Sequence, residues 1–152
     1  MKELLKPYIS TSQNINHLRD SVIKMGQYLK NRYPDIQLDY IGGPITADGP
    51  ANIKRNLILL GSVAEIIHMS EGVFTYTNPY VGDLRRFPGL SESDFILYSA
   101  QLLESGIFDR LTLVEGWERS VGSNDEYRRA IAIGIQIRTY PLDKMALSTN
   151  AI

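Results

Sequence analysis

Short apolar segments typical of strands alternate along this chain with longer segments of helical periodicity. The strand-like segments share runs of apolar, β-branched and aromatic residues bounded by turn signals, and cover residues 36–41, 73–77, 107–114 and 135–139. Between them the spacing predicts helices over residues 53–71, 91–105 and 123–133. Strands joined by helices run parallel. The order therefore predicts an α/β fold, a Rossmann-like (flavodoxin-like) open parallel sheet of four to five strands with helices on both faces.

A further helical segment precedes the first predicted strand. Apolar residues recur at helical spacing over 14–32, and Pro34 follows as a stop signal. This extra helix leads us to divide the chain of 152 residues into an N-terminal helical extension, 1–35, and a core, 36–140. The length suits a single domain spanning 1–152.

Composition and charge exclude several classes of function. The chain has no cysteine, which excludes thiol catalysis and cysteine zinc sites. A net charge of -1 provides no positive field for a nucleic-acid polymer, so a small-molecule partner is expected. His17 and His68 lie in separate helical patterns, so no metal site is expected. No apolar run reaches signal-peptide or bilayer length, which predicts a cytoplasmic protein without a membrane partner.

Two loops follow predicted strands and carry polar side chains suited to a binding site. Tyr40 ends the first strand, where a core tyrosine would also be ordinary, and Gly42-Gly43-Pro44 follows as a turn. The loop 115–122 follows the third strand. Ligands of open parallel sheets bind beyond the carboxyl ends of the strands, where the strand order reverses. If these two strands are neighbours, we expect the loops to face each other across one crevice.

The second loop contains groups that could bind an anion. Gly116 and Gly122 allow the backbone to approach a ligand closely. The helix after Gly122 offers unpaired backbone N–H groups, and Ser120 and Ser123 add hydroxyl donors. These features favour a phosphate or carboxylate at the start of this helix.

Three carboxylates near these loops have structural as well as chemical interpretations. Ser123-x-x-Glu126 matches a capping box, although the first turn of a helix also favours the ionised state that a nucleophilic carboxylate needs. Ser91-x-x-Asp94 is a second capping pattern. Asp109, in the third strand, is either a charge at the strand edge or a residue facing the crevice.

The two turn motifs together resemble the nucleoside 2-deoxyribosyltransferase-like superfamily. Members show a strand ending in Tyr-x-x-Gly-Pro, as in Tyr40-Ile41-Gly42-Gly43-Pro44, and later Ser/Asp-x-Gly-x-x-x-Glu, as in Ser120 to Glu126. Asp94 and Asp109 stand where the family has an aspartate opening a helix and one opening a strand. The segment Gly116-Trp117-Glu118-Arg119-Ser120 is similar to the corresponding segment of small bacterial and phage members. The resemblance covers about residues 37–137.

The resemblance implies a set of roles. Glu126 would attack C1′ of a deoxyribose and hold a covalent glycosyl intermediate, Tyr40 would orient Glu126, and Asp94 would protonate the departing base. No metal or organic cofactor is implied. The residues expected to bind substrate are Gly43, Pro44, Asp109, Gly116, Trp117, Ser120, Gly122, Ser123 and, near the C-terminus, Asn150. Family members use such a C-terminal residue across a subunit interface, so a homodimer or higher homo-oligomer is expected.

Ser120 bears on the choice of substrate. The position six residues before the nucleophile is aspartate in transferases acting on nucleosides and serine in the nucleotide N-hydrolases that this chain resembles. A carboxylate would repel a 5′-phosphate, whereas a hydroxyl at a helix start can donate to it. We therefore expect hydrolysis of a 2′-deoxynucleoside 5′-monophosphate. Base exchange between nucleosides, a non-catalytic nucleotide sensor or adaptor, and a protein acting only through protein contacts stay as alternatives.

Overall fold

The computed structural model describes residues 1–143 and is organised around a parallel sheet. Its four strands are β1 (Leu38–Gly42), β2 (Phe74–Tyr76), β3 (Arg110–Val114) and β4 (Gln136–Tyr140). They lie in the order β2-β1-β3-β4, and every neighbouring pair is parallel. The predicted α/β class with an open parallel sheet is confirmed, and the expected neighbours β1 and β3 are paired from Asp39–Arg110 to Gly42–Leu113.

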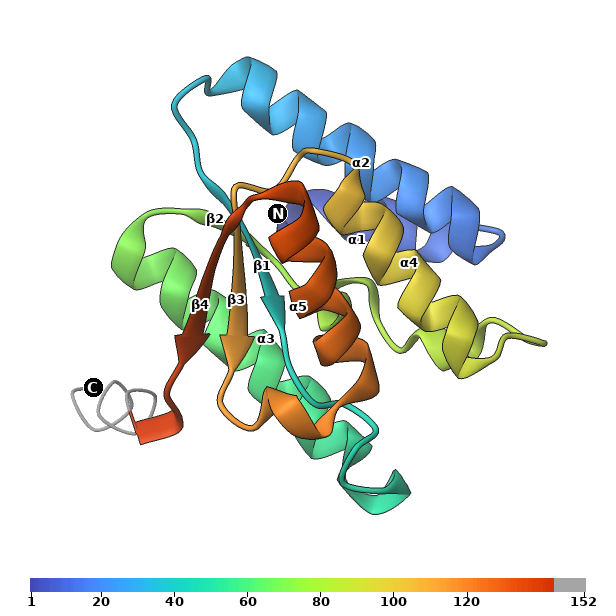
Figure 1. The fold of residues 1–152 in the computed structure, drawn as a ribbon. Coiled ribbons are helices and arrows are strands. Elements are labelled where there is room, and N and C mark those ends of the chain that lie inside the picture. The colour runs from blue at the N-terminus through green and yellow to red at the C-terminus, as the bar shows by residue number, and fades with distance from the viewer. Residues whose placement is uncertain (144–152) are drawn as a thin grey trace.

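Helices cover both faces of this sheet. The connecting helices are α3 (Ile53–Glu71), α4 (Glu92–Glu104) and α5 (Val121–Ile133). Figure 1 shows α3 on one face and α4 with α5 on the other. The chain leaves β1 for β2 through α3 and then returns across β1 to β3 through α4. The strand order therefore reverses between β1 and β3, which places a ligand crevice at their carboxyl ends.

Two helices precede the sheet. The predicted helix at 14–32 is α2 (Ile15–Arg32), capped by Asn14, whose side chain accepts from the His17 N–H at 2.8 Å. A preceding helix, α1 (Lys2–Thr11), was not predicted and contains Pro7. Both helices join the core through their apolar residues: α2 packs on α4, and α1 packs on α2 and on the segment after β2. Within residues 1–143, no helix combines the length and the apolarity needed to cross a membrane.

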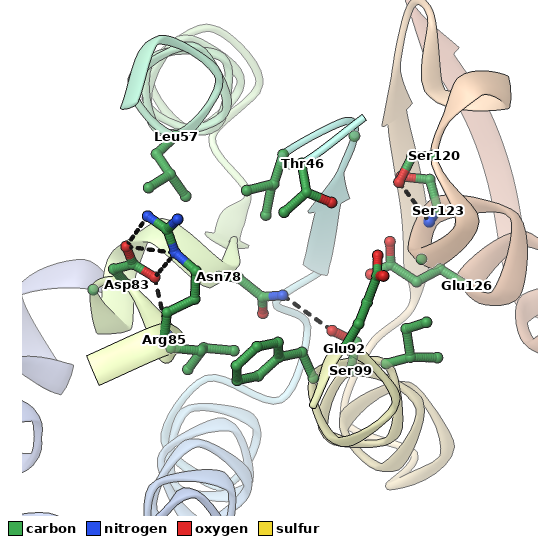
Figure 2. A pocket seen from close by; sticks show the side chains of 17 residues that line it. Thr46, Leu57, Asn78, Asp83, Arg85, Glu92, Ser99, Ser120, Ser123 and Glu126 are labelled. Carbon is green, nitrogen blue, oxygen red and sulfur yellow. Dashed lines mark hydrogen bonds and ion pairs between the residues drawn. The ribbon is translucent and has the colours of Figure 1, made fainter. Parts of the chain in front are cut away.

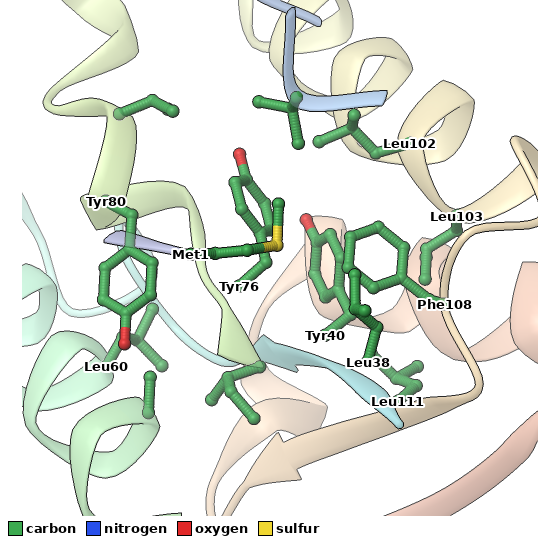
Figure 3. Packing of buried hydrophobic residues seen from close by; sticks show 14 of the residues in the cluster. Met1, Leu38, Tyr40, Leu60, Tyr76, Tyr80, Leu102, Leu103, Phe108 and Leu111 are labelled. Atoms are coloured by element: carbon green, nitrogen blue, oxygen red, sulfur yellow. The ribbon is translucent and has the colours of Figure 1, made fainter. Parts of the chain in front are cut away.

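The sheet face under α4 is filled by aromatic rings. Tyr40 of β1 contacts Tyr76 and Phe108, with ring centroids 5.5 and 5.2 Å apart (Figure 3). Leu38 and Leu111 complete this layer, and all these side chains are almost fully buried. Aromatic contacts of this kind stabilise by about 0.5–1.5 kcal/mol beyond area burial. The layer therefore fixes the Tyr40 ring beneath the carboxyl end of the sheet.

The opposite face, on the α3 side, carries a charged network. Asp39 is completely buried and accepts from Arg110 Nη2 at 2.6 Å and from Thr112 Oγ1 at 2.9 Å. Arg138 Nη2 donates to Glu71 Oε2 at 2.7 Å, and Arg110 also reaches Glu71. Side chains alternate between faces along a strand, so β1 contributes Tyr40 to one core and Asp39 to the other.

Candidate active site

A cavity of about 310 Å³ opens at the carboxyl ends of β1 and β3. Its walls come from the loop after β1, the loop after β2, one side of α4 and the first turns of α5 (Figure 2). The volume lies in the range of small-molecule sites, about 300–1,000 Å³. The crevice predicted from the two loops therefore exists at the reversal of strand order.

Tyr40 and Glu126 meet at the floor of this cavity. Glu126 lines the cavity and is only 6% exposed, and it lies close enough to the Tyr40 hydroxyl for each group to shift the pKa of the other. The Tyr40 hydroxyl itself donates to Asn78 Oδ1 at 3.3 Å. Gly42 makes room for the Glu126 carboxylate, because a Cβ there would stand 2.9 Å from Glu126 Oε1. The structure thus brings together the phenol and the carboxylate that lie 86 positions apart in the sequence (126 minus 40).

Burial controls the ionisation of this pair. Burial raises the pKa of Glu126 to about 7, and the hydrogen bond from Tyr40 opposes the rise while the nearby charge of Asp125 adds to it. Burial and the charge of Glu126 also raise the pKa of Tyr40. Near neutral pH the phenol therefore keeps its proton, and the carboxylate beside it changes charge with small changes of pH.

We expect Glu126→Gln to stabilise the protein at high pH. The pKa of Glu126 is about 7 in the folded protein against an ordinary value of 4.5, so stability associated with the protonated carboxyl is complete below about pH 4.5 and is lost as pH rises through about 7. That difference corresponds to about 3 kcal/mol. Urea unfolding should show a gain approaching this value at about pH 8 and little change at about pH 4.

A matched control separates this effect from a general effect of removing a charge. Glu118→Gln changes an exposed glutamate in the turn before α5 and should alter the free energy of unfolding little at either pH. A gain for Glu126→Gln of equal size at both pH values would contradict the argument.

The start of α5 corrects one sequence interpretation. The helix begins at Val121 and its N-cap is Ser120, whose Oγ accepts from the Ser123 N–H at 3.2 Å. The predicted capping box of Ser123 and Glu126 is therefore wrong. Glu126 lies in the second turn, too far along the helix to cap it, and its side chain lines the cavity.

Ser123 carries an unpaired polar atom beside the cavity. Its Oγ is buried and has no hydrogen-bond partner within the described part of the chain. Ser120 and Gly122 line the same wall, at the N-terminus of α5. An unsatisfied buried hydroxyl costs about 1–3 kcal/mol, which a ligand acceptor would relieve. The hydroxyl and the helix N-terminus together are suited to an anion.

Asp94 lies outside the cavity lining. Its Oδ2 accepts from the Ser91 N–H at 2.8 Å and from Ser91 Oγ at 2.9 Å, so the capping box predicted there is confirmed. Glu92, two residues earlier on α4, lines the cavity instead. Two residues correspond to about 200° around a helix, which directs the two carboxylates to different sides. Sequence reasoning missed Glu92.

The glycine and proline of the first turn have separate locations. Gly43 lines the cavity, and a Cβ there would lie 2.7 Å from Leu60 Cδ2, which explains the need for glycine. Pro44 and Gly116 line a different cavity, bounded by the loop after β1, the first half of α3 and the loop after β3. Those two predicted binding residues are therefore not brought to the site of Glu126.

Two other predicted binding residues are also placed elsewhere. Trp117 stacks on Tyr127 with ring centroids 4.9 Å apart and does not line the cavity. Asp109 precedes β3 and accepts from Lys30 Nζ and the Leu38 N–H, both at 2.8 Å. It therefore lies at the amino end of the sheet, opposite the site, so the expectation that it faces the crevice is wrong.

Six polar residues that line the cavity had no role assigned from the sequence, namely Thr46, Asn78, Asp83, Arg85, Glu92 and Ser99. Asn78 and Ser99 lie next to the Tyr40–Glu126 pair, and Asp83 is hydrogen-bonded to Arg85 on the far wall (Figure 2). Of these residues, only Asn78 belongs to a recognisable sequence pattern, because Asn78-Pro79 is typical of the start of a turn. Asn150, the predicted C-terminal contributor, lies outside the described residues.

Among residues 1–143, no three His, Asp or Glu side chains are grouped so as to hold a metal ion. Comparisons of the chain with protein-family models, with curated proteins and with solved structures each found no match. The geometry of the cavity is therefore the basis for assigning a function.

Proposed function

We propose that this protein hydrolyses the N-glycosidic bond of a 2′-deoxynucleoside 5′-monophosphate. The observation that carries the proposal is the buried carboxylate of Glu126 on the floor of a ligand-sized cavity, near the Tyr40 hydroxyl. Retaining glycosidases use one carboxylate that faces the substrate as nucleophile and a second carboxyl group as acid, and Glu126 is placed to act as the first.

The proposed reaction has two steps. One carboxylate oxygen of Glu126 attacks C1′ while the C1′–N bond breaks, and the base departs with the bonding electrons and takes up a proton. Water then hydrolyses the glycosyl ester, which restores the carboxylate. Glu92 is the carboxyl group on the cavity wall that we assign as proton donor, in place of Asp94. General acids of this kind contribute about 10²–10⁴-fold.

The cavity also supports the choice of a nucleotide. Phe95, Ile96 and Leu57 provide apolar wall against which a base can pack. Ser120, Ser123 and the N-terminus of α5 provide donors for a 5′-phosphate. We propose deoxyribose as the sugar because the two turn motifs resemble those of deoxyribosyltransferase-like proteins.

Ser123→Ala should weaken the reaction with monophosphates selectively. A hydrogen bond to a charged group contributes about 1.5–3 kcal/mol, so kcat/KM for deoxynucleoside monophosphates should fall by about 10–100-fold. The value for the corresponding deoxynucleosides should change little, because they carry no phosphate. Chromatography of the released base measures both.

The control is Ser21→Ala, which removes another buried serine hydroxyl, in α2 and remote from the cavity. It should leave both substrates unaffected. If Ser123→Ala lowered kcat/KM equally for nucleotides and nucleosides, the proposed phosphate position beside Ser123 would be rejected.

One observation favours a second candidate, a nucleotide sensor without catalysis. Asp94, the acid implied by the resemblance, caps α4 outside the cavity lining. Such a sensor would show a thermal shift with a deoxynucleotide and no base release. Release of base from any of the four common deoxynucleotides supports hydrolysis, and formation of a new nucleoside on adding an acceptor base would indicate transfer instead.

A further inference from the structure

The cavity wall contains an ion pair that the proposed reaction does not use. Asp83 and Arg85 both line the cavity, in the segment between β2 and α4. Arg85 Nε donates to Asp83 Oδ1 at 2.9 Å, and Arg85 Nη2 donates to Asp83 Oδ2. Figure 2 shows the guanidinium next to Leu57, on one side of the cavity, and Ser120 and Ser123 on the other side. The pair therefore lies away from the proposed phosphate position.

The backbone holds this ion pair in one arrangement. Asp83 caps the short 3-10 helix Leu84–Arg86, and its Oδ1 accepts from the Arg85 N–H at 2.9 Å. The carboxylate thus binds the backbone and the side chain of Arg85 at the same time. A guanidinium that is already fixed by parallel N–H bonds loses little further freedom when it binds a ligand.

The pair offers hydrogen-bond donors to the cavity and no acceptor. Each Asp83 oxygen already accepts two N–H contacts from Arg85, which matches the two lone-pair directions of a carboxylate oxygen. Arg85 Nη1 has no hydrogen-bond partner among residues 1–143, and a guanidinium nitrogen only donates. Because the two charges cancel, this wall suits a neutral group with an acceptor oxygen better than a second phosphate.

The amide oxygen at the cavity floor is also occupied. Asn78 Oδ1 accepts from Tyr76 at 3.1 Å and from Tyr40 at 3.3 Å. The two glutamates that line the cavity, Glu92 and Glu126, act at the glycosidic bond in the proposed reaction. An amino group that reached the wall of Asp83 would therefore find donors there and no free acceptor.

We propose that Arg85, held by Asp83, selects bases that carry an oxo group over bases that carry an amino group at the same ring position. This selectivity rests on the proposed function, because it requires a nucleotide whose phosphate lies at Ser120 and Ser123. The base then presents the edge farthest from its sugar to Arg85. Position 6 of a purine and position 4 of a pyrimidine lie on that edge, where an oxo group accepts and an amino group donates. A buried amino group facing donors loses its hydrogen bond with water.

Two pairs of nucleotides test this selectivity, because the members of each pair differ at that one position. Deoxyinosine monophosphate (dIMP) has oxygen at position 6 where dAMP has an amino group, and dUMP differs from dCMP in the same way at position 4. Isothermal titration calorimetry with Glu126→Gln measures binding without base release. The oxo member of at least one pair should bind about 10–100-fold more tightly. The pair that shows this preference identifies the base as a purine or a pyrimidine.

Arg85→Gln, combined with Glu126→Gln, tests the residue itself. Glutamine can donate or accept, so the two members of each pair should then bind almost equally. Half of the Arg85 side chain is exposed (50%), so the fold should be retained. The matched control is Arg128→Gln in the same background, because Arg128 is an exposed arginine of α5 that does not line the cavity. This control should keep the preference for the oxo base.

Equal dissociation constants within both pairs would overturn the proposal, and so would a preference that Arg85→Gln leaves unchanged. Base release is measured separately, on the protein that retains Glu126. Release of base together with equal binding within both pairs would support hydrolysis and reject the role of Arg85. A preference that is lost in Arg85→Gln, in a protein that releases no base, would support the role of Arg85 and reject hydrolysis.

Discussion

Replacing Glu126 by glutamine is expected to lower the rate of base release from a deoxynucleoside monophosphate by a factor of about 10³ or more. Glutamine has nearly the same size as glutamate, so the cavity should keep its shape. The amide oxygen is a poor nucleophile, however, and cannot form the glycosyl ester. The loss should therefore appear in kcat, whereas nucleotide binding measured by thermal shift should persist.

The matched control is Asp125→Asn, the neighbouring acid on α5. Asp125 is paired with Arg129 at 2.7 Å and does not line the cavity. Its replacement should leave kcat within a few-fold of the original. Intact-mass measurement during turnover should detect the glycosyl adduct on the original protein and none on Glu126→Gln. Undiminished base release by Glu126→Gln would remove Glu126 from the mechanism.

The location of the site could be predicted because it follows from the order of elements. Alternating strands and helices, separated by glycine and proline turns, restrict the chain to a parallel sheet whose loops gather at one edge. Tyr40 and Glu126 belong to the two loop regions that meet at the reversal of strand order. Their contact therefore needed only the adjacency of β1 and β3, which the structure has.

The identity of the second acid could not be predicted, because it depends on helix phase. Glu92 and Asp94 are both acidic residues in the first turn of α4. Which one faces the cavity is decided by how α4 packs on α5 and α2, a tertiary contact that a local pattern does not encode. The start of α5 is a similar case: Ser120 and Ser123 are both suitable caps, and the structure uses the first.

The other differences between the sequence-based predictions and the structure have simpler physical causes. Asp109 was expected to bind substrate because the family resemblance has an aspartate opening a strand at that place, but it stands before the first residue of β3. Five residues of strand span about 16 Å, which separates it from the carboxyl edge. Asn78 and Ser99 are ordinary polar residues 21 positions apart, and only the tertiary fold brings α4 and the segment after β2 together. Helix α1 was not predicted because it contains Pro7, a residue that usually interrupts a helix. Its Leu5 is buried by tertiary contacts.

Asp39→Asn is expected to destabilise the fold by about 3–5 kcal/mol, the range found when one partner of a buried ion pair is removed. Burial raises the pKa of Asp39 while its bonds to Arg110 and Thr112 oppose the rise. The ion pair therefore offsets a large desolvation cost, and loss of the charge would leave the guanidinium of Arg110, which is 6% exposed, without its buried partner.

Glu71→Gln provides the comparison, because Glu71 binds the same guanidinium from a more exposed position, with 29% of its side chain accessible. Because solvent screens that pair, its loss should lower the free energy of unfolding by only about 0–1 kcal/mol. Urea unfolding of both variants at neutral pH measures the difference. Asp39 lies on the sheet face opposite Tyr40, so the Asn variant should keep the ionisation midpoint of Glu126 where it folds. Equal losses for Asp39→Asn and Glu71→Gln would show that the network is solvated throughout, contrary to the burial of Asp39.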